Sequence, residues 1–491
     1  MKKINIFIML ICAINSFSIK SSNSSLPRHW SQYTASEKLY WHLYNAVFDG
    51  NIKEVQKYTD LKADVNFVVN HWPLLIEAVS KKNIKIVQIL INAGADVNVT
   101  NEAGEYPLFI AVKNKSTEIV NLLIKAGAKV NFEDRTTGIT PLILAVVNKS
   151  LEMVQALIQA GAYVNVEINK YTALTLAIER KNIKIAQALI QAGADLNRGP
   201  KSQGTDLIFA IKYLYDSSII EALIAAPNVD LEAQDKNGET ALMIAMQQKL
   251  NFKIIEALIT APNPGLNIQD KNGETALMIA IRRELDPKII EALITSPKAD
   301  LNVQNKKGQT ALMTAIFYTA FPYKKKLSFK IVEALITSHK ADLNVQDKNG
   351  ETALMFAIRM ISIQKKLNFK IIEALINAPQ ADLNLQDNNG WTALMCAVLT
   401  KNNAIVQLLI NKKVNLNLKD NKGKTALFYA KELTNKMISK LLEKAGAQDD
   451  SETLSNSSAI LLQQCVNTLE EDDTMEINSL EKFASCVETL E

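Results

Sequence analysis

The sequence predicts an all-α solenoid, a stack of about twelve helix-turn-helix repeats, and three observations support this class. The segment DKNGETALMIA stands at Asp235–Ala245 and again, unchanged, at Asp270–Ala280. Related segments recur at nearly regular intervals along most of the chain. Such recurrence is expected of units that bury their apolar faces only against copies of themselves. The chain is 48% hydrophobic but only 6% aromatic. The apolar residues are therefore mainly aliphatic, which favours helical layers.

The length also favours an array. A chain of 491 residues is long for one globular core, because single cores stop growing at roughly 250–300 residues. The charged fraction of 22% is typical of folded proteins, so extensive disorder is not expected.

The repeats start at an equivalent position, which is usually threonine. The starts are Trp72, Tyr106, Thr140, Thr172, Thr205, Thr240, Thr275, Thr310, Thr352, Thr392 and Thr425. Their spacings are 34, 34, 32, 33, 35, 35, 35, 42, 40 and 33 residues. A more degenerate unit, Leu39–Asn66, precedes them and suits a terminal cap.

One repeat, Asp270–Asn302, illustrates the expected parts. It begins with the turn Asp-Lys-Asn-Gly, in which Gly273 supplies the positive φ needed where the chain reverses. Thr275 is expected to cap the first helix with its hydroxyl group. The second helix is expected at Pro287–Thr295, with proline in an early position that tolerates it. Each repeat is thus a turn and two antiparallel helices.

This pattern resembles the ankyrin repeat, whose period is about 33 residues and whose signature is T-P-L-H-x-A. The match is strongest at GITPLILA (Gly138–Ala145) and at the G-x-T-A-L-M-x-A copies, and it covers residues 37–447. The family's histidine appears at none of the equivalent positions, and apolar residues take its place in eight repeats. These are Phe109, Ile143, Met243, Met278, Met313, Met355, Met395 and Phe428.

The resemblance implies a non-catalytic scaffold that binds a protein partner on its concave side, through the turn tips and the exposed edge of the first helices. The matching positions are Lys236, Asn237 and Glu239; Lys271, Asn272 and Glu274; Lys306, Lys307 and Gln309; Lys348, Asn349 and Glu351; and Asn388, Asn389 and Trp391. Trp391 is the leading candidate, because large aromatic residues often anchor interfaces. The alternative is that Trp391 packs along its own hairpin and that the other tips are solvated turns.

The spacings of 42 and 40 indicate insertions between the two helices of adjacent repeats, at Phe317–Phe329 and Arg359–Phe369. Together with the preceding repeat they predict a basic ridge at the end of the array opposite the turn tips. Its residues are Arg282, Arg283, Lys324, Lys325, Lys326, Lys365 and Lys366. The ridge could receive an acidic partner, phosphate groups or the chain's own acidic tail, or it could be a solvated loop.

The first eighteen residues predict a signal peptide, with residues 19–36 as a linker. Lys2 and Lys3 precede an apolar run, Ile4–Ile14, and small residues flank Phe17. An exported protein, without a membrane span once mature, is therefore expected, and it resembles the secreted ankyrin-repeat proteins of host-associated bacteria. The alternative is a structural protein of the cell envelope, anchored by the uncleaved segment.

Residues 448–491 form an acidic tail with 11 acidic residues and one lysine, so its net charge is −10 while that of residues 1–447 is +14. Apolar residues at helical spacing indicate a possible short helical hairpin around Cys465 and Cys486. In an exported protein these thiols could form a disulfide, but they could equally stay unpaired.

The sequence lacks the patterns of an enzyme. The four histidines, His29, His42, His71 and His339, have no metal-ligand spacing, and the phosphate-loop and nucleophile motifs are absent. We therefore expect no catalytic site, no cofactor and no metal. The expected molecule is a monomer with a protein partner. Nucleic-acid binding through the lysine-rich ridge is the less favoured alternative.

Overall fold

The structure is a computed structural model and describes residues 34–69, 72–135, 137–199, 204–213, 216–320, 329–363 and 369–448. These residues form 24 α-helices, labelled α2 to α25, and one sheet of two short antiparallel strands. In that sheet, β1 (Val68–Val69) pairs with β2 (Trp72–Pro73), and Val68 lies opposite Pro73. The predicted all-α fold built from helix pairs is confirmed.

The helices alternate along the chain between a first and a second helix of each repeat. The first helices are α2 (Ala35–Phe48), α4 (Leu74–Ser80), α6 (Pro107–Lys113), α8 (Pro141–Val147), α10 (Ala173–Glu179), α12 (Asp206–Tyr213), α14 (Ala241–Gln247), α16 (Ala276–Arg282), α18 (Ala311–Ala320), α20 (Ala353–Ile363), α22 (Ala393–Leu399) and α24 (Ala426–Glu432). The second helices are α3 (Ile52–Asp60), α5 (Ile84–Asn92), α7 (Thr117–Lys125), α9 (Leu151–Gln159), α11 (Ile183–Gln191), α13 (Ser217–Ile224), α15 (Phe252–Thr260), α17 (Pro287–Thr295), α19 (Phe329–Thr337), α21 (Phe369–Asn377), α23 (Asn403–Asn411) and α25 (Lys436–Lys444).

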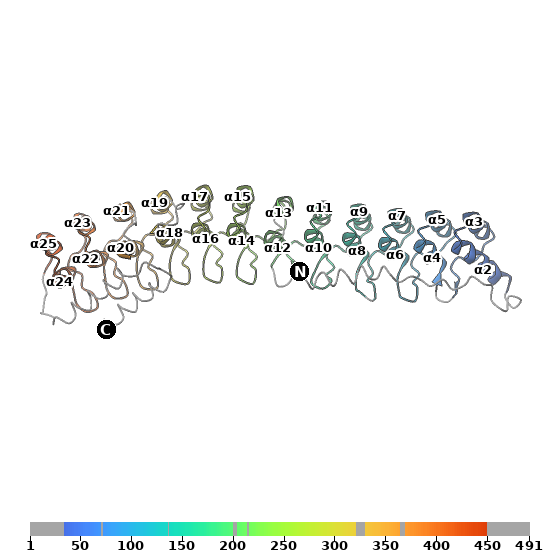
Figure 1. Ribbon diagram of the computed structural model, residues 1–491, viewed down its shortest axis with the longest axis horizontal. Helices are drawn as coiled ribbons and strands as arrows, with labels where there is room; N and C mark the ends of the chain where they lie inside the picture. The colour runs from blue at the N-terminus through green and yellow to red at the C-terminus, as the bar shows by residue number, and fades with distance from the viewer. Residues whose placement is uncertain are drawn as a thin grey trace. The chain divides into compact units, whose positions relative to one another are not determined.

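The chain forms two compact units. Unit 1 extends to Ala177 and includes Gln191–Gly193, and unit 2 comprises the residues from Ile178 onward apart from those three. Within each unit, first helices contact the next first helices and second helices contact the next second helices, as for α16 with α18 and α17 with α19. The loops between repeats project beyond the layer of first helices (Figure 1).

The core of each unit lies between these layers and between successive repeats. The methionines that replace the ankyrin histidine are almost completely buried, including Met243, Met278 and Met395. A buried histidine would require a polar partner, whereas a flexible thioether fills the same space without one. The methionines that replace the histidine therefore contribute apolar packing to the core.

A threonine cap accounts for the start of many first helices. In the repeats that begin at Thr240, Thr275, Thr310, Thr352, Thr392 and Thr425, the threonine hydroxyl oxygen accepts a hydrogen bond from the amide three residues later, at 3.3–3.5 Å. This bond satisfies one of the amides left unpaired at a helix start. Gly273, in the turn before, has φ of +75°. Both predictions for this repeat are confirmed.

A ladder of asparagine side chains links neighbouring repeats. The Asn302 side-chain amide donates to the carbonyl of Lys340 at 2.9 Å, and its oxygen accepts from the amide of Asp342 at 2.7 Å. Both partners belong to the following repeat. Asparagines at the equivalent position make the same pair of bonds within each unit. They are Asn66, Asn98, Asn131, Asn197, Asn267 and Asn344.

Replacing Asn302 by alanine is expected to lower the local stability of the adjoining repeats by about 1–2 kcal/mol, because two backbone groups lose their partners. Asn302→Asp keeps the acceptor for Asp342 but loses the donor, so we expect a smaller effect. Hydrogen exchange of residues 329–345, followed by mass spectrometry, measures both changes. Exchange rates in Asn302→Ala equal to those of the unmodified chain would show that the ladder does not stabilise the stack.

The insertions predicted in two repeats partly extend the first helices. α18 and α20 contain 10 and 11 residues, compared with 7 in α14 and α16. Phe317 and Tyr318, which the sequence placed in an insertion, therefore lie in the last turns of α18. The two aromatic rings therefore project from a helix and not from a loop.

Candidate functional site

The turn tips of unit 2 are stacked by hydrogen bonds. The amide of Lys271 donates to the carbonyl of Asn237 at 2.9 Å, and the amide of Lys306 donates to that of Asn272 at 2.9 Å. The same bond, at 3.0–3.2 Å, joins Lys348, Asn388 and Asn421 to the tip before each of them. Each tip is therefore held by its predecessor.

A glutamine before each of these turns adds a second link. The Gln269 side chain donates to the carbonyl of Gly273 in its own turn at 2.7 Å and to that of Gln304 in the next repeat at 2.8 Å. Gln234, Gln304, Gln346 and Gln386 make the same two contacts in their repeats. These bonds satisfy backbone carbonyls that a projecting loop would otherwise leave to water.

The tips of unit 1 differ. A Cβ atom added at the turn glycine Gly138 would meet nothing within 4 Å, whereas one at Gly308 would lie 2.5 Å from the amide nitrogen of Lys348. Among the described residues of unit 1, no backbone bond joins one tip to the next. The tips form a continuous structure in unit 2 alone, as far as the chain is described.

The structure separates the predicted tip residues into two groups. Ten are exposed: Lys236, Asn237, Lys271, Asn272, Lys306, Lys307, Lys348, Asn349, Asn388 and Asn389. The residues that follow the turn glycine are less accessible. Glu239, Glu274, Gln309 and Trp391 are partly buried, and Glu351 is only 5% exposed.

Three glutamates in that second group bind the first helix of their own repeat. Glu274 accepts two hydrogen bonds from Arg282, at 3.0 and 2.7 Å. Glu351 pairs with Arg359, and Glu239 accepts a hydrogen bond from Gln247. The partner stands eight residues later in each case, about two helical turns along the same face. These carboxylates are therefore already engaged within the fold.

This pairing corrects the predicted position of Arg282. The sequence placed Arg282 in a basic ridge at the end of the array opposite the turn tips, but its guanidinium group lies against Glu274, which directly follows a tip. The physical reason is that the last turn of a short helix lies within reach of its first turn for a long side chain. Arg283, the C-cap of α16, is exposed.

Several predicted residues lie outside the described part of the chain. They are Lys324, Lys325, Lys326, Lys365 and Lys366 of the ridge, Cys465 and Cys486 of the tail, and the predicted signal peptide at residues 1–18. Cys396, the free cysteine among the described residues, is partly buried on α22.

Trp391 packs against the following repeat. Its ring centroid lies 5.4 Å from that of Tyr429 on α24, at an interplanar angle of 49°. The Tyr429 hydroxyl in turn donates to the buried carboxylate of Asp420. The backbone amide of Trp391 donates to Asp387 at 2.8 Å. Trp391 is thus partly exposed and held on an aromatic neighbour, an arrangement that neither alternative from the sequence described.

Sequence reasoning missed a second aromatic pair, which lies on α18. Phe317 occupies the position in its repeat that Arg282 and Arg359 occupy in theirs, and it packs edge to face on Tyr318 at 5.2 Å. Both rings are partly exposed. Burial raises the pKa of Tyr318, which also senses the charges of Arg282 and Glu274. The alignment of the repeats could have found this pair, because Phe317 and Tyr318 stand eight and nine positions after Gln309, the residue that follows the turn glycine.

Three carboxyl groups interact with the charge of Arg359. Burial raises the pKa of Glu351 to about 7, while Arg359 opposes that rise. Burial also raises the pKa values of Asp347 and Asp387, the first residues of two successive turns, and Arg359 again acts in the opposite direction. This junction between repeats therefore holds one cation and several carboxyl groups that are costly to ionise.

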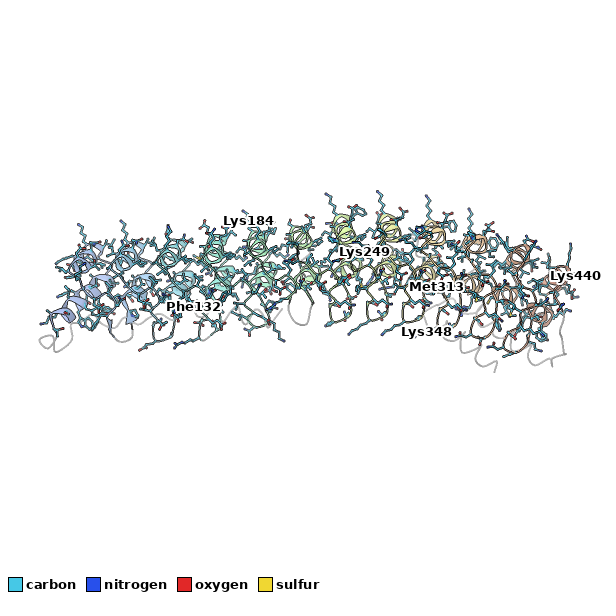
Figure 2. The ribbon with its side chains drawn as sticks, turned by 180° about the vertical axis from the view of Figure 1, so that it is seen from behind. Phe132, Lys184, Lys249, Met313, Lys348 and Lys440 are labelled. Carbon is cyan, nitrogen blue, oxygen red and sulfur yellow. The ribbon has the colours of Figure 1, made fainter. Side chains whose placement is uncertain are left out.

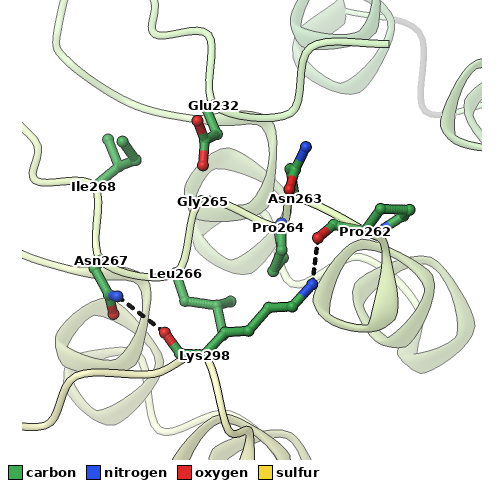
Figure 3. Close-up of a pocket in the computed structure, with 9 residues that line it drawn as sticks. All are labelled: Glu232, Pro262, Asn263, Pro264, Gly265, Leu266, Asn267, Ile268 and Lys298. Atoms are coloured by element: carbon green, nitrogen blue, oxygen red, sulfur yellow. Dashed lines mark hydrogen bonds between the residues drawn. The ribbon is translucent and has the colours of Figure 1, made fainter. Parts of the chain in front are cut away.

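A pocket of about 240 Å³ lies elsewhere in unit 2, beside the loop after α15. It is lined by Glu232, Pro262–Ile268 and Lys298 (Figure 3). Lys298 donates its ammonium proton to the carbonyl of Pro262, and its own carbonyl accepts from Asn267 at 2.9 Å. These polar groups stabilise the loop. Within the described residues, no group of three or more metal-binding side chains converges, and no helix is both long and apolar enough to cross a bilayer.

Comparison with known families supports the repeat architecture. The family described as ankyrin repeats (3 copies) matches residues 43–134, 108–199, 207–305, 285–365 and 359–453, which is more than half of the chain. None of the curated proteins compared with the sequence matches it significantly.

Proposed function

Because the chain belongs to the ankyrin-repeat family, we propose that it is a non-catalytic scaffold that binds a protein partner through the first helices and turn tips of unit 2. We define the candidate face by five partly exposed residues: Arg282, Phe317, Tyr318, Arg359 and Trp391. They belong to four successive repeats: Arg282, Phe317, Tyr318 and Arg359 lie toward the C-terminal ends of first helices, and Trp391 directly precedes the N-cap of α22.

The proposal depends mainly on which residue types form this face. Tryptophan, tyrosine and arginine are enriched among the few residues that supply most of the binding energy of protein interfaces. Arg282, Phe317 and Arg359 occupy equivalent positions in three successive repeats, and Tyr318 follows Phe317. Trp391 stands in the next repeat, at the position that Glu274 and Glu351 occupy in theirs.

The supporting structure is rigid. Each arginine is held by a carboxylate, Trp391 rests on Tyr429, and the adjacent tips are joined by backbone and glutamine bonds. A preorganised face loses little conformational entropy when it binds. A rigid face suits a partner that presents a folded surface or a helix, because only the side chains of the two surfaces then need to match.

We expect Trp391→Ala to weaken partner binding by about 10–30-fold, the loss typical of an interface anchor. The measurement is quantitative capture from cell extracts on the immobilised chain, followed by a titration of each enriched protein. Tyr163→Ala is the control, since Tyr163 is an aromatic residue that is 67% exposed in unit 1. Equal binding by the unmodified chain, Trp391→Ala and Tyr318→Ala would place the interface elsewhere.

The proposed setting is outside the cytoplasm. Its support is the N-terminal segment, in which two lysines precede an apolar run that ends near small residues. N-terminal sequencing of the protein isolated from cells and from medium tests this. A mature chain that begins near residue 19 in the medium supports export, and a cell-bound chain that begins at Met1 would favour the anchored alternative.

A further inference from the structure

The exposed lysines of the stacked tips have no acidic partner among the described residues. Lys236, Lys271, Lys306, Lys307 and Lys348 are all exposed, and no ion pair or side-chain hydrogen bond engages their ammonium groups within the described part of unit 2. We call these five residues the tip row. Figure 2 shows Lys348 at the free edge of the loops, away from Met313 in the helical layers.

The acidic residues beside the tip row are directed inward. Asp270 uses one carboxylate oxygen to accept the amides of Asn272 and Glu274, at 2.7 and 2.8 Å, and Asp347 does the same for Asn349 and Glu351. The glutamates after the turns pair with Arg282 and Arg359. None of these four carboxylates therefore forms an ion pair with a lysine of the tip row.

The stack also fixes the geometry of the row. Successive tips advance by one repeat, and packed helices lie about 8–10 Å apart, so the row from Lys236 to Lys348 spans about 24–30 Å over three steps. Because each tip is bonded to its predecessor, this spacing is built in. A single line of positive charges matches one extended anionic chain better than it matches a flat anionic surface or a nucleic-acid duplex.

The chain itself contains such a segment. Residues 449–491 include all 11 acidic residues of the tail. Five of these lie within seven residues: Glu470, Glu471, Asp472, Asp473 and Glu476. At about 3.3 Å per residue an extended seven-residue segment covers about 23 Å, which is close to the length of the tip row.

The structure places the start of this tail on the correct side. The amide of Gln448, the last described residue, donates to the side chain of Asn417 at 2.8 Å. Asn417 continues the asparagine ladder that leads from second helices toward the tips. Lys348 lies three repeats before Gln448, or about 24–30 Å at the same spacing. The 21 residues between Gln448 and Glu470 can span up to about 70 Å, at about 3.3 Å per residue, so they are long enough for residues 470–476 to reach the tip row.

We propose that the tip row is an electrostatic docking strip for the chain's own acidic segment, residues 470–476. When docked, the segment lies along the edge of the candidate face and competes with acidic partners for it. Tethering within one chain provides an effective concentration in the millimolar range, so a weak charge-based contact is sufficient. Proteins that bind the scaffold at this edge must displace the segment.

The test is zero-length carbodiimide cross-linking of the full chain, which joins lysine amines directly to carboxylates. An equal mixture of unlabelled and nitrogen-15-labelled protein, treated with nuclease, distinguishes links within one chain from links between chains. We expect links from the tip row to residues 470–476 within single chains. Their yield should fall at least about fivefold at 1 M salt, where the screening length is about 3 Å.

Two variants complete the test. Replacing the five tip-row lysines by glutamine should increase the mobility of the tail, seen as a change in fluorescence anisotropy of a dye at Cys486. The matched control replaces Lys253, Lys288, Lys330, Lys436 and Lys440, which are equally exposed but lie on second helices, and should leave the anisotropy unchanged. Links only between chains, links distributed equally over both lysine sets, or equal effects of both variants would overturn the proposal.

Discussion

Gly308→Ala is expected to destabilise the repeats around it by about 3 kcal/mol or more, whereas Gly138→Ala should cost about 1 kcal/mol. Both glycines occupy the last position of a turn and have positive φ, +78° and +69°. The strain of alanine in this conformation is therefore common to both. Only Gly308 adds a clash, because its new Cβ would lie 2.5 Å from the amide nitrogen of Lys348 and 2.9 Å from the backbone of Asp347.

A side-chain rotation cannot relieve this clash, since the opposing atoms belong to the backbone. The tip after Gly308 must move away, which breaks the bond from the Lys348 amide to the carbonyl of Lys307 and strains the two bonds of Gln304. Hydrogen exchange around residues 304–316 and 346–356, compared with residues 134–147 in Gly138→Ala, measures the two effects. If the two variants lose the same stability, the tips of unit 2 are not held in contact.

Arg359→Met is expected to destabilise the C-terminal repeats by about 3 kcal/mol at pH 8 but by about 1 kcal/mol at pH 5. At pH 8 the variant leaves the carboxylate of Glu351 buried and without its cation. At pH 5 the carboxyl group is protonated and needs no cation. The sign follows from the pKa of Glu351, which burial raises to about 7 in the folded chain.

The unmodified chain should show the same direction more weakly. A carboxyl group whose pKa is higher in the folded state than in the unfolded state binds its proton more tightly when folded. Its contribution to stability is present below the unfolded value of about 4.5 and is lost as the pH rises through about 7. Asp347 and Asp387, which share the cation, have pKa values shifted in the same direction.

Adding Glu351→Gln to Arg359→Met should remove most of the pH dependence, because the buried neutral amide has no charge to lose. Urea unfolding at pH 5 and pH 8 measures the cycle. With Trp30, Trp41 and Trp72 replaced by phenylalanine, Trp391 is the remaining tryptophan and reports on the repeats next to Glu351. A double variant as unstable at pH 8 as Arg359→Met alone would contradict the assignment.

The sequence predicted the parts of the fold that depend on local chemistry. A threonine before an apolar helix caps it, and a glycine in a reversing turn takes positive φ, as Thr275 and Gly273 show. Each of these rules acts within a few residues, so a single repeat was enough to infer them. The recurrence of the pattern then indicated that helix pairs stack.

The candidate site was only partly predictable. Trp391 could be selected because the other copies carry glutamate, glutamine, lysine or isoleucine at this position, but its contact with Tyr429 crosses a repeat boundary. Glu274 and Glu351 read as free tip residues, and their pairing with arginines eight positions later required the actual length and direction of α16 and α20. Phe317 and Tyr318 were assigned to an insertion because their repeat is longer than its neighbours.

The sequence alone is sufficient to infer that this protein is a stack of helix pairs, because each copy contains the hydrophobic periodicity, the cap and the turn of a repeat. The tertiary structure alone decided which copies are tied at their tips. Among the described residues, backbone hydrogen bonds join successive turns of unit 2 and none joins the turns of unit 1, although both carry a glycine in the same place. The reason is physical: a hydrogen bond between repeats depends on the distance between two backbones, and that distance is set by how whole helices pack.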